Sequence, residues 1–246
     1  MTLALLLAAA CRPPLDEAGS IFYSGDERTV HCAMNLDHAT GSEALLDNVL
    51  AGLDRAAQRG EIIELFAHRP GTTVGWDDLE VVLAGAAQRN LRFFTYAELL
   101  DGPAEPGIAL SFDDAAISAW YEGRELFARY GARATFFVTR YAEWTQEGRQ
   151  MLRTLAADGH SVEPHGRHHL DAPQFVEEHG VRAFLRDEVL PSIDALVAEG
   201  YTPTTYAYPY GKRTSETDRA ILAYLPRVRS LTYSFRAPLV SNPCPR

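Results

Sequence analysis

The chain has 246 residues, of which 46% are hydrophobic and 23% charged, as is ordinary for a globular protein with one large core or two small ones. Its formal net charge of -10 disfavours nucleic acid and other polyanions as partners, because these bind basic surfaces. A neutral or cationic substrate fits this charge better.

The chain begins with an apolar segment, MTLALLLAAA, that runs directly into Cys11. The segment is too short to span a bilayer as a helix, but small residues before a cysteine resemble the cleavage site of a bacterial lipoprotein signal. No basic residue precedes the apolar run, so we expect the true signal to be longer. We predict that residues 1–19 are signal and spacer, and that the protein is exported to the cell envelope with a lipid anchor on Cys11, or is otherwise secreted. The alternative is an untargeted N-terminus.

Export also changes how the remaining cysteines are interpreted. If Cys11 carries lipid, Cys32 and Cys244 are left as an even pair. An oxidising compartment would let them form a disulfide. The alternative is two unrelated buried thiols.

Eight short, mostly apolar runs follow, each typical of a parallel strand that is covered on both faces. In chain order they are TVHCAMNL (29–36), IIELFA (62–67), LRFFTY (91–96), GIALSF (107–112), ATFFV (134–138), HSVEP (160–164), TTYAY (204–208) and SLTYSF (230–235).

Between these runs, apolar residues recur with helical spacing. The predicted helices cover residues 42–60, 76–90, 116–131, 144–159 and 184–200, with Pro191 near a helix start or at a kink. Alternation of strand and helix predicts an α/β domain, and about eight strands favour a (β/α) barrel over the alternative, a doubly wound open sheet. The segment DGPAEPG (101–107) either separates two domains or joins two elements of one domain.

Polar residues follow the carboxyl ends of the predicted strands, which share one face in an α/β barrel. They are Asp37, His68, Asp113, Asp114, His165, His168, His169 and Tyr210. Segments that are far apart in the sequence are therefore expected to converge.

Two of these histidines, His165 and His169, have the spacing i, i+4, which in a helical turn would let both imidazoles bind one metal ion. A carboxylate from Asp113 or Asp114 would complete a set that is typical of catalytic zinc. Each signal is weak by itself, because such histidines are often solvated and paired aspartates often cap helices. Their joint place at strand ends favours a site.

Three segments resemble the first three motifs of the polysaccharide deacetylases with the NodB-homology fold, also grouped as carbohydrate esterase family 4. They are LSFDDA (110–115), PHGRHH (164–169) and YPYG (208–211), and their order and spacing also match. The resemblance implies a distorted (β/α) barrel.

That family ends in a strand with a catalytic histidine, but no histidine follows YPYG in this chain. The corresponding segment, GEIIELFAHRPG, lies near the beginning and contains His68. The simplest account is a circularly permuted domain in residues 20–246, with a closing part in 20–100, a linker in 101–107 and an opening part in 108–246. A Cys32–Cys244 disulfide would then pin the seam between the new termini. The rival account is a truncated C-terminus preceded by a fragment of a duplicate.

The resemblance implies the role of each residue. Asp114, His165 and His169 hold a divalent metal ion, most simply Zn²⁺, and His168 is only a neighbour. Asp113 is the base for a metal-bound water, and a backbone N–H near Tyr210 stabilises the oxyanion. His68 protonates the leaving amine. Asp37 either orients His68 or is a plain loop residue.

One position departs from the family pattern. Ala207 stands where many members have an arginine that pairs with the base. Arg236 is a candidate replacement and Lys212 a weaker one. The aromatic residues Tyr206, Tyr208 and Tyr210 either line a sugar-binding groove or pack in the core.

These features favour a metal-dependent deacetylase that acts on an N-acetylated glycan. The alternatives are hydrolysis of a non-sugar amide at the same site and a catalytically impaired glycan-binding protein. No nucleic-acid partner is expected, and the sequence gives no basis for an oligomeric state.

Overall fold

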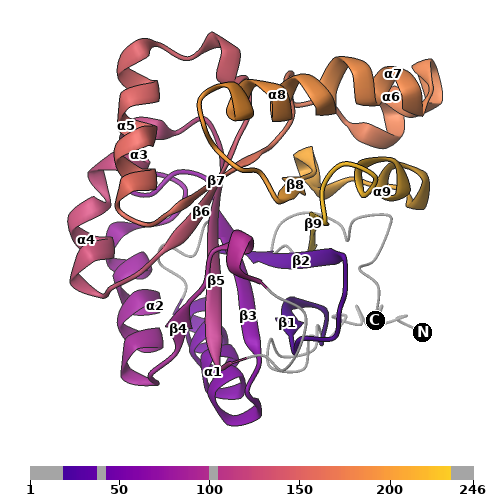
Figure 1. Cartoon of the computed structure of the whole chain (residues 1–246). Coiled ribbons are helices and arrows are strands. Elements are labelled where there is room, and N and C mark those ends of the chain that lie inside the picture. Colours follow the sequence, from indigo (N-terminus) through magenta and orange to yellow (C-terminus); the bar gives the residue numbers. More distant parts are fainter. Residues whose placement is uncertain (1–18, 38–42, 100–104, 234–246) are drawn as a thin grey trace, which may run out of the picture.

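The computed structural model describes residues 19–37, 43–99 and 105–233 (Figure 1). The predictions for Cys11, Arg236, Cys244 and most of the 101–107 segment lie outside these residues. Cys32 is disulfide-bonded. Its partner is also outside the described residues, so the pairing with Cys244 stays a prediction.

The described residues form one sheet. Its strands are β1 (Phe22–Tyr23), β2 (Val30–Asn35), β3 (Ile62–Ala67), β4 (Arg92–Phe93), β5 (Gly107–Asp114), β6 (Ala134–Val138), β7 (Ser161–Pro164), β8 (Thr205–Ala207) and β9 (Arg227–Tyr233). Along the sheet the order is β7-β6-β5-β3-β2-β9-β8, with every neighbouring pair parallel. Because the first strand of this order in the chain, β2, pairs with the last, β9, the order read as a circle is the chain order β2, β3, β5, β6, β7, β8, β9.

The two ends of this order, β7 and β8, are joined by a side chain. The carboxylate of Glu163 in β7 accepts hydrogen bonds from the backbone N–H groups of Thr204 and Thr205, at 2.7 and 2.9 Å. Burial raises the pKa of Glu163 to about 7, although these donors oppose the rise. The sheet is thus a nearly closed barrel, as expected, and the doubly wound open sheet is wrong.

Helices lie outside the sheet (Figure 1). They are α1 (Glu43–Arg59), α2 (Trp76–Gln88), α3 (Ile117–Glu122), α4 (Arg124–Arg129), α5 (Gln146–Ala157), α6 (Ala172–His179), α7 (Val181–Phe184), a π-helix (Leu185–Val189), α8 (Leu190–Ala198) and α9 (Ser215–Ile221). Pro191 lies in the first turn of α8, as predicted. Within the described ranges, no helix has the length and apolar character needed to cross a membrane.

Along each strand, successive side chains point in turn toward the helices and toward the barrel interior. In β5, Ile108, Leu110 and Phe112 belong to the core between sheet and helices, whereas Ala109 belongs to a small cluster inside the barrel. By the same alternation Ser111 and Asp113 face inward. The interior thus accommodates polar side chains that lead up to the carboxyl ends of the strands.

Two predicted strands differ most from the structure. The 91–96 run forms only the short β4, because Thr95 caps a 3-10 helix at Tyr96–Glu98. Strand β9 begins at Arg227, not at Ser230. The sequence pattern excluded its two arginines, but both are buried in the structure.

Candidate active site

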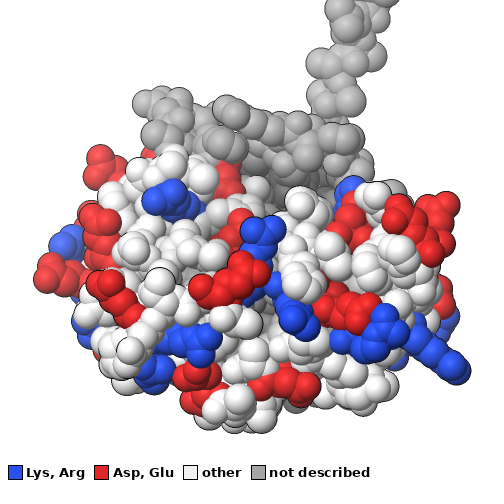
Figure 2. Space-filling model, turned by 90° about the horizontal axis from the view of Figure 1, so that it is seen from above, with Lys and Arg blue, Asp and Glu red and all other residues white. Residues whose placement is uncertain are grey.

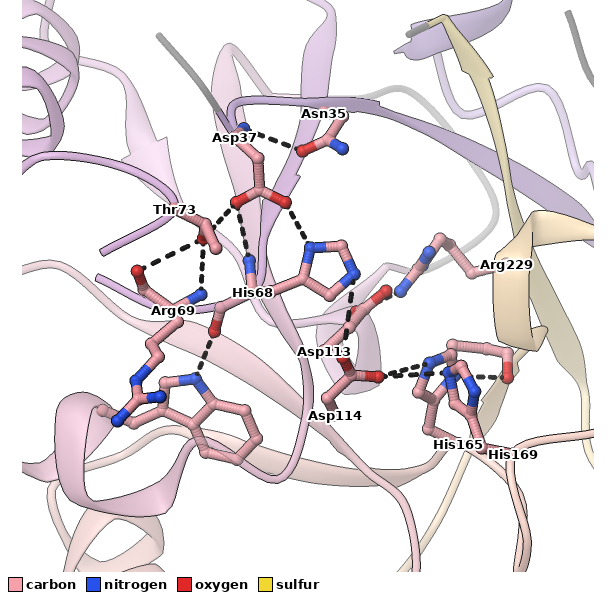
Figure 3. Close-up of polar contacts among 12 residues, drawn as sticks. Asn35, Asp37, His68, Arg69, Thr73, Asp113, Asp114, His165, His169 and Arg229 are labelled. Atoms are coloured by element: carbon pink, nitrogen blue, oxygen red, sulfur yellow. Dashed lines mark hydrogen bonds and ion pairs between the residues drawn. The ribbon is translucent and has the colours of Figure 1, made fainter. Parts of the chain in front are cut away.

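The polar residues predicted at strand ends do converge. Asp113 and Asp114 end β5, His68 directly follows β3, and His165 directly follows β7. Because these strands are parallel, the four side chains meet at the same end of the barrel. Figure 3 shows His68 on one side of Asp114, with His165 and His169 on the other.

Asp114, His165 and His169 form a group that could hold a metal ion, with one ligand atom of each within 4.8 Å of the others. Oδ1 of Asp114 lies 3.5 Å from Nε2 of His165 and 3.1 Å from Nε2 of His169. This buried oxygen accepts no hydrogen bond from any described residue. One carboxylate and two imidazoles around a shared point match the donor set of a catalytic zinc site.

A second contact fixes how His165 presents its ring. Its Nδ1 lies 2.9 Å from the carbonyl oxygen of Ala207, which can only accept, so Nδ1 carries the proton. In the neutral ring, Nε2 is then the nitrogen whose lone pair can bind a metal ion. Burial opposes the charge of Asp114, but contact with the two imidazoles holds the pKa of this carboxyl well below its usual range.

The expected helical turn at His165 and His169 is wrong. Residues 165–170 form an irregular loop, in which Gly166 and His169 have φ of 83° and 64°. Asp114 also lies in the left-handed region, with φ of 83°. Such conformations are uncommon for residues with a Cβ and concentrate at functional sites.

The candidate base is held by a residue that the sequence reasoning missed. A guanidinium nitrogen of Arg229, in β9, pairs with Oδ1 of Asp113, and both side chains are buried. Of the two expected replacements, Lys212 pairs instead with Asp171, and Arg236 lies outside the described residues, so that prediction is not tested. Arg229 is the register partner of Ala207, so the cation lies one strand away from its expected place.

The candidate acid, His68, contacts Asp37, which the sequence left open as either its partner or a plain loop residue. Nδ1 of His68 bonds to Oδ2 of Asp37, and the backbone N–H of His68 donates to Oδ1 at 3.1 Å. The other ring nitrogen, Nε2, lies 4.0 Å from Oδ2 of Asp114. Burial alone would lower the pKa of His68, but the bond to Asp37 and the charges of Asp113 and Asp114 raise it to about 9.

A family model described as polysaccharide deacetylase matches residues 101–226, which is just over half of the chain. The chain belongs to the polysaccharide deacetylase family. Membership of this family indicates a hydrolase that removes acetyl groups from a glycan.

Two solved structures support the same fold for this deacetylase. IcaB from Ammonifex degensii is 19% identical with a TM-score of 0.55, over 75% of this chain and 91% of that one. BC0361, a polysaccharide deacetylase from Bacillus cereus, is 14% identical with a TM-score of 0.57, over 70% of this chain and 58% of that one. Among curated proteins, none matches the chain. The barrel is the distorted (β/α) barrel of NodB type that the motifs implied.

The three tyrosines in and just before the deacetylase's third motif have different surroundings. Tyr206 and Tyr208 are fully buried and belong to a hydrophobic cluster, so for these two the packing alternative holds. Tyr210 is 56% exposed, has φ of 59°, and lies edge-on to His169 with ring centroids 4.6 Å apart. Only Tyr210 is therefore available to a ligand.

Two further residues of the deacetylase, which sequence reasoning missed, hold Asp37 and the backbone of His68 in place. The hydroxyl of Thr73 donates to Asp37 at 2.5 Å, and the indole N–H of Trp120 donates to the carbonyl oxygen of His68 at 2.8 Å. Neither residue belongs to a recognisable motif. The contacts depend on how loops and helices pack, which no spacing in the sequence reveals.

Proposed function

We propose that this protein is a metal-dependent deacetylase that hydrolyses the N-acetyl amide of an N-acetylated glycan. The observation that carries the proposal is the arrangement of Asp113 and His68 around the group formed by Asp114, His165 and His169. A candidate base and a candidate acid thus lie beside one candidate metal site.

The residues of that group suit a divalent metal ion, and their nitrogen and carboxylate donors favour zinc. When bound, such an ion supplies Lewis-acid polarisation of the amide carbonyl and of a water molecule. Asp114 and His169 would hold it, together with Nε2 of His165.

The protein's own residues account for the proton transfers. Asp113, oriented by Arg229, takes a proton from the attacking water, whose oxygen adds to the amide carbon. His68 gives a proton to the amide nitrogen as the C–N bond breaks, which yields acetate and a free amine. In the metal-free protein the pKa of His68 is raised to about 9, and the bond to Asp37 favours the protonated form that this role requires.

The developing charge on the carbonyl oxygen needs a hydrogen-bond donor. The left-handed turn at Tyr210 supports the backbone N–H of this residue as that donor, because it lies beside His169 at the same end of the barrel. The exposed ring of Tyr210 offers a sugar a flat apolar surface.

We also propose that the domain is circularly permuted. The family match begins at residue 101 and so leaves out β2, β3 and His68. Yet β3 pairs with β5 in register, from Ile62 opposite Gly107 to Ala67 opposite Phe112. This pairing supports residues 20–100 as the closing part of the domain that residues 108–246 open.

Export and a lipid anchor on Cys11 complete the proposal and fit a substrate in the cell envelope. They rest on the sequence of the first residues alone. On the face drawn in Figure 2, basic and acidic side chains are interspersed, so this face offers a polyanion no continuous basic surface.

The test is release of acetate from N-acetylglucosamine oligomers and from peptidoglycan, with chelator-stripped protein before and after addition of zinc. We expect zinc-dependent release and a loss of about 100-fold or more in Asp113→Asn, which should still bind zinc. Release from a non-sugar amide alone would favour a different amide substrate. Glycan binding without release, unaffected by Asp113→Asn, would show a binding protein and overturn the proposal.

A further inference from the structure

The loop that carries His169 rests on a buried carboxylate. Oε2 of Glu188 accepts the backbone N–H of His168 at 2.7 Å, and Oε1 accepts the backbone N–H of Leu170 at 2.9 Å. The Glu188 side chain is fully buried. Its two hydrogen bonds therefore flank His169 on both sides.

This support meets a specific need of the loop. His169 has φ of 64°, a backbone conformation that a residue with a Cβ keeps only when its surroundings enforce it. The bond to the N–H of Leu170 fixes the peptide plane that follows His169, and the bond to the N–H of His168 fixes the plane that enters the residue before it. They thereby set the direction in which its imidazole leaves the backbone.

Other bonds tie the beginning of the same loop to its neighbours. The hydroxyl of Thr139 and the backbone N–H of Arg140 both donate to the carbonyl oxygen of Gly166, at 3.0 and 3.2 Å. The backbone N–H of Arg167 donates to the carbonyl oxygen of Glu188 at 3.1 Å. Glu188 thus holds the second half of the loop, where His169 lies.

The local geometry leaves little room for another arrangement. Glu188 lies in the π-helix between α7 and α8, a distortion that is frequent at functional sites. A Cβ added to Gly166, which has φ of 83°, would overlap with Oε1 of Glu188. Gly166 and Glu188 therefore fit together as a pair.

We infer that Glu188 is a positioning residue for the metal site, which acts through the backbone of His169 and touches neither metal nor substrate. Burying a carboxylate is costly unless hydrogen bonds compensate it, and here the compensating donors are the two amides that flank a candidate ligand. The inference rests on the proposed function in so far as His169 binds metal.

The experiment uses the full chain with Glu188→Gln, Glu188→Ala and a matched control, Val189→Ala. Glutamine keeps the shape of the side chain but turns an amino group toward one of the two N–H donors. Val189 is the next residue of the same π-helix and is also fully buried, so its truncation weakens the helix without removing the carboxylate. Zinc affinity is measured by competition with a chromophoric chelator, and hydrogen exchange of the 168 and 170 amides is measured by NMR on metal-free protein.

Both Glu188 variants should bind zinc about 10- to 100-fold more weakly and lose protection at the two amides, while Val189→Ala keeps both properties. Equal losses in all three variants, or unchanged affinity and protection in the Glu188 variants, would overturn the inference. If the parent protein binds no zinc, the metal site of the proposed function fails. Amide protection then decides alone: its loss in the Glu188 variants still supports the positioning of the loop, and its persistence overturns it.

Discussion

Ala207 and Arg229 lie directly opposite each other on the parallel strands β8 and β9, and Arg229 reaches the carboxylate of Asp113 inside the barrel. The cation that pairs with the candidate base has thus moved to the neighbouring strand. It packs between Phe66 and Phe137, with its guanidinium carbon 5.0 and 4.7 Å from their ring centroids. The pair is therefore shielded from water, with an aromatic ring on each side of the guanidinium.

We expect Arg229→Ala to destabilise the protein by about 3–5 kcal/mol, because it leaves the buried carboxylate of Asp113 without its partner. Deacetylation should fall with it. The double variant Ala207→Arg/Arg229→Ala returns the cation to the family position and roughly conserves interior volume, so it should recover part of both losses. Chemical denaturation and acetate release measure these effects, and wild-type behaviour of Arg229→Ala would contradict the assigned role.

Asp37 should control the protonation of His68. Because the pKa of His68 is raised in the folded protein, its protonation stabilises the fold fully below about pH 6.5. This contribution is lost as the pH rises to about 9. Asp37→Asn keeps one acceptor oxygen but removes the charge, so the pKa of His68 should fall. We expect an NMR titration of metal-free protein to show this fall, and the alkaline limb of kcat to move to lower pH.

Thr73→Val provides the control for that experiment. It removes one hydrogen bond to Asp37 but leaves the carboxylate charge in place. The alkaline limb should therefore shift much less than in Asp37→Asn. Equal shifts in the two variants would show that geometry, and not charge, governs His68.

The stability of the protein in acid should depend on His160, which is buried and directly precedes β7, whereas His165 directly follows it. Nδ1 of His160 accepts the backbone N–H of Ala134 at 2.9 Å, and burial lowers the pKa of His160 to about 4. Above about pH 6.5 the imidazole is neutral in both folded and unfolded chains. Between about pH 6.5 and 4 only the unfolded chain takes up the proton, so stability falls by about 3 kcal/mol from this residue.

His160→Asn keeps an acceptor for Ala134 and does not titrate, so its free energy of unfolding should decline less between pH 6.5 and 4. The difference between the two proteins in how far the free energy of unfolding declines across this window gives the contribution of His160. His179→Asn, at an exposed position, is the control and should follow the parent profile. Parallel curves for the parent and His160→Asn would refute the assignment.

Residues 20–100 should not fold alone. β3 would lose β5 along one edge, and the hydrophobic core that contains Leu53 and Ile63 also contains Phe112 and Phe136 from the rest of the chain. We expect this fragment to unfold without a cooperative transition in thermal melting followed by circular dichroism. A cooperative melt would favour two separate domains.

The sequence predicted most of the fold because the buried strands are almost continuous apolar runs. β3 is an example, since all of its residues are buried and the predicted and observed bounds agree. It also predicted that Asp113, Asp114, His68 and His165 meet, because parallel strands place their carboxyl ends together. The resemblance to a family added the roles, which remain proposals.

What the sequence did not predict depends on exceptions to local rules. Arg229 lies inside a barrel, where a charged residue breaks the apolar pattern of a strand and was therefore excluded from it. His169 has a left-handed φ, so it does not adopt the helical conformation that its spacing from His165 suggested. Glu188 was treated as part of an ordinary amphipathic helix, because a π-helix has no signature in spacing alone.

The pairing of β2 with β9 has a consequence for how the chain folds. Val30 is in register with Val228, so almost the whole described chain separates the two partners. Until β9 has been synthesised, one edge of β2 has no strand to pair with, while β3 covers the other. An unpaired edge of this kind readily recruits a strand from another molecule, and such long-range pairing forms slowly. Refolding yield should therefore decrease as protein concentration rises, with swapped dimers as the first misfolded product.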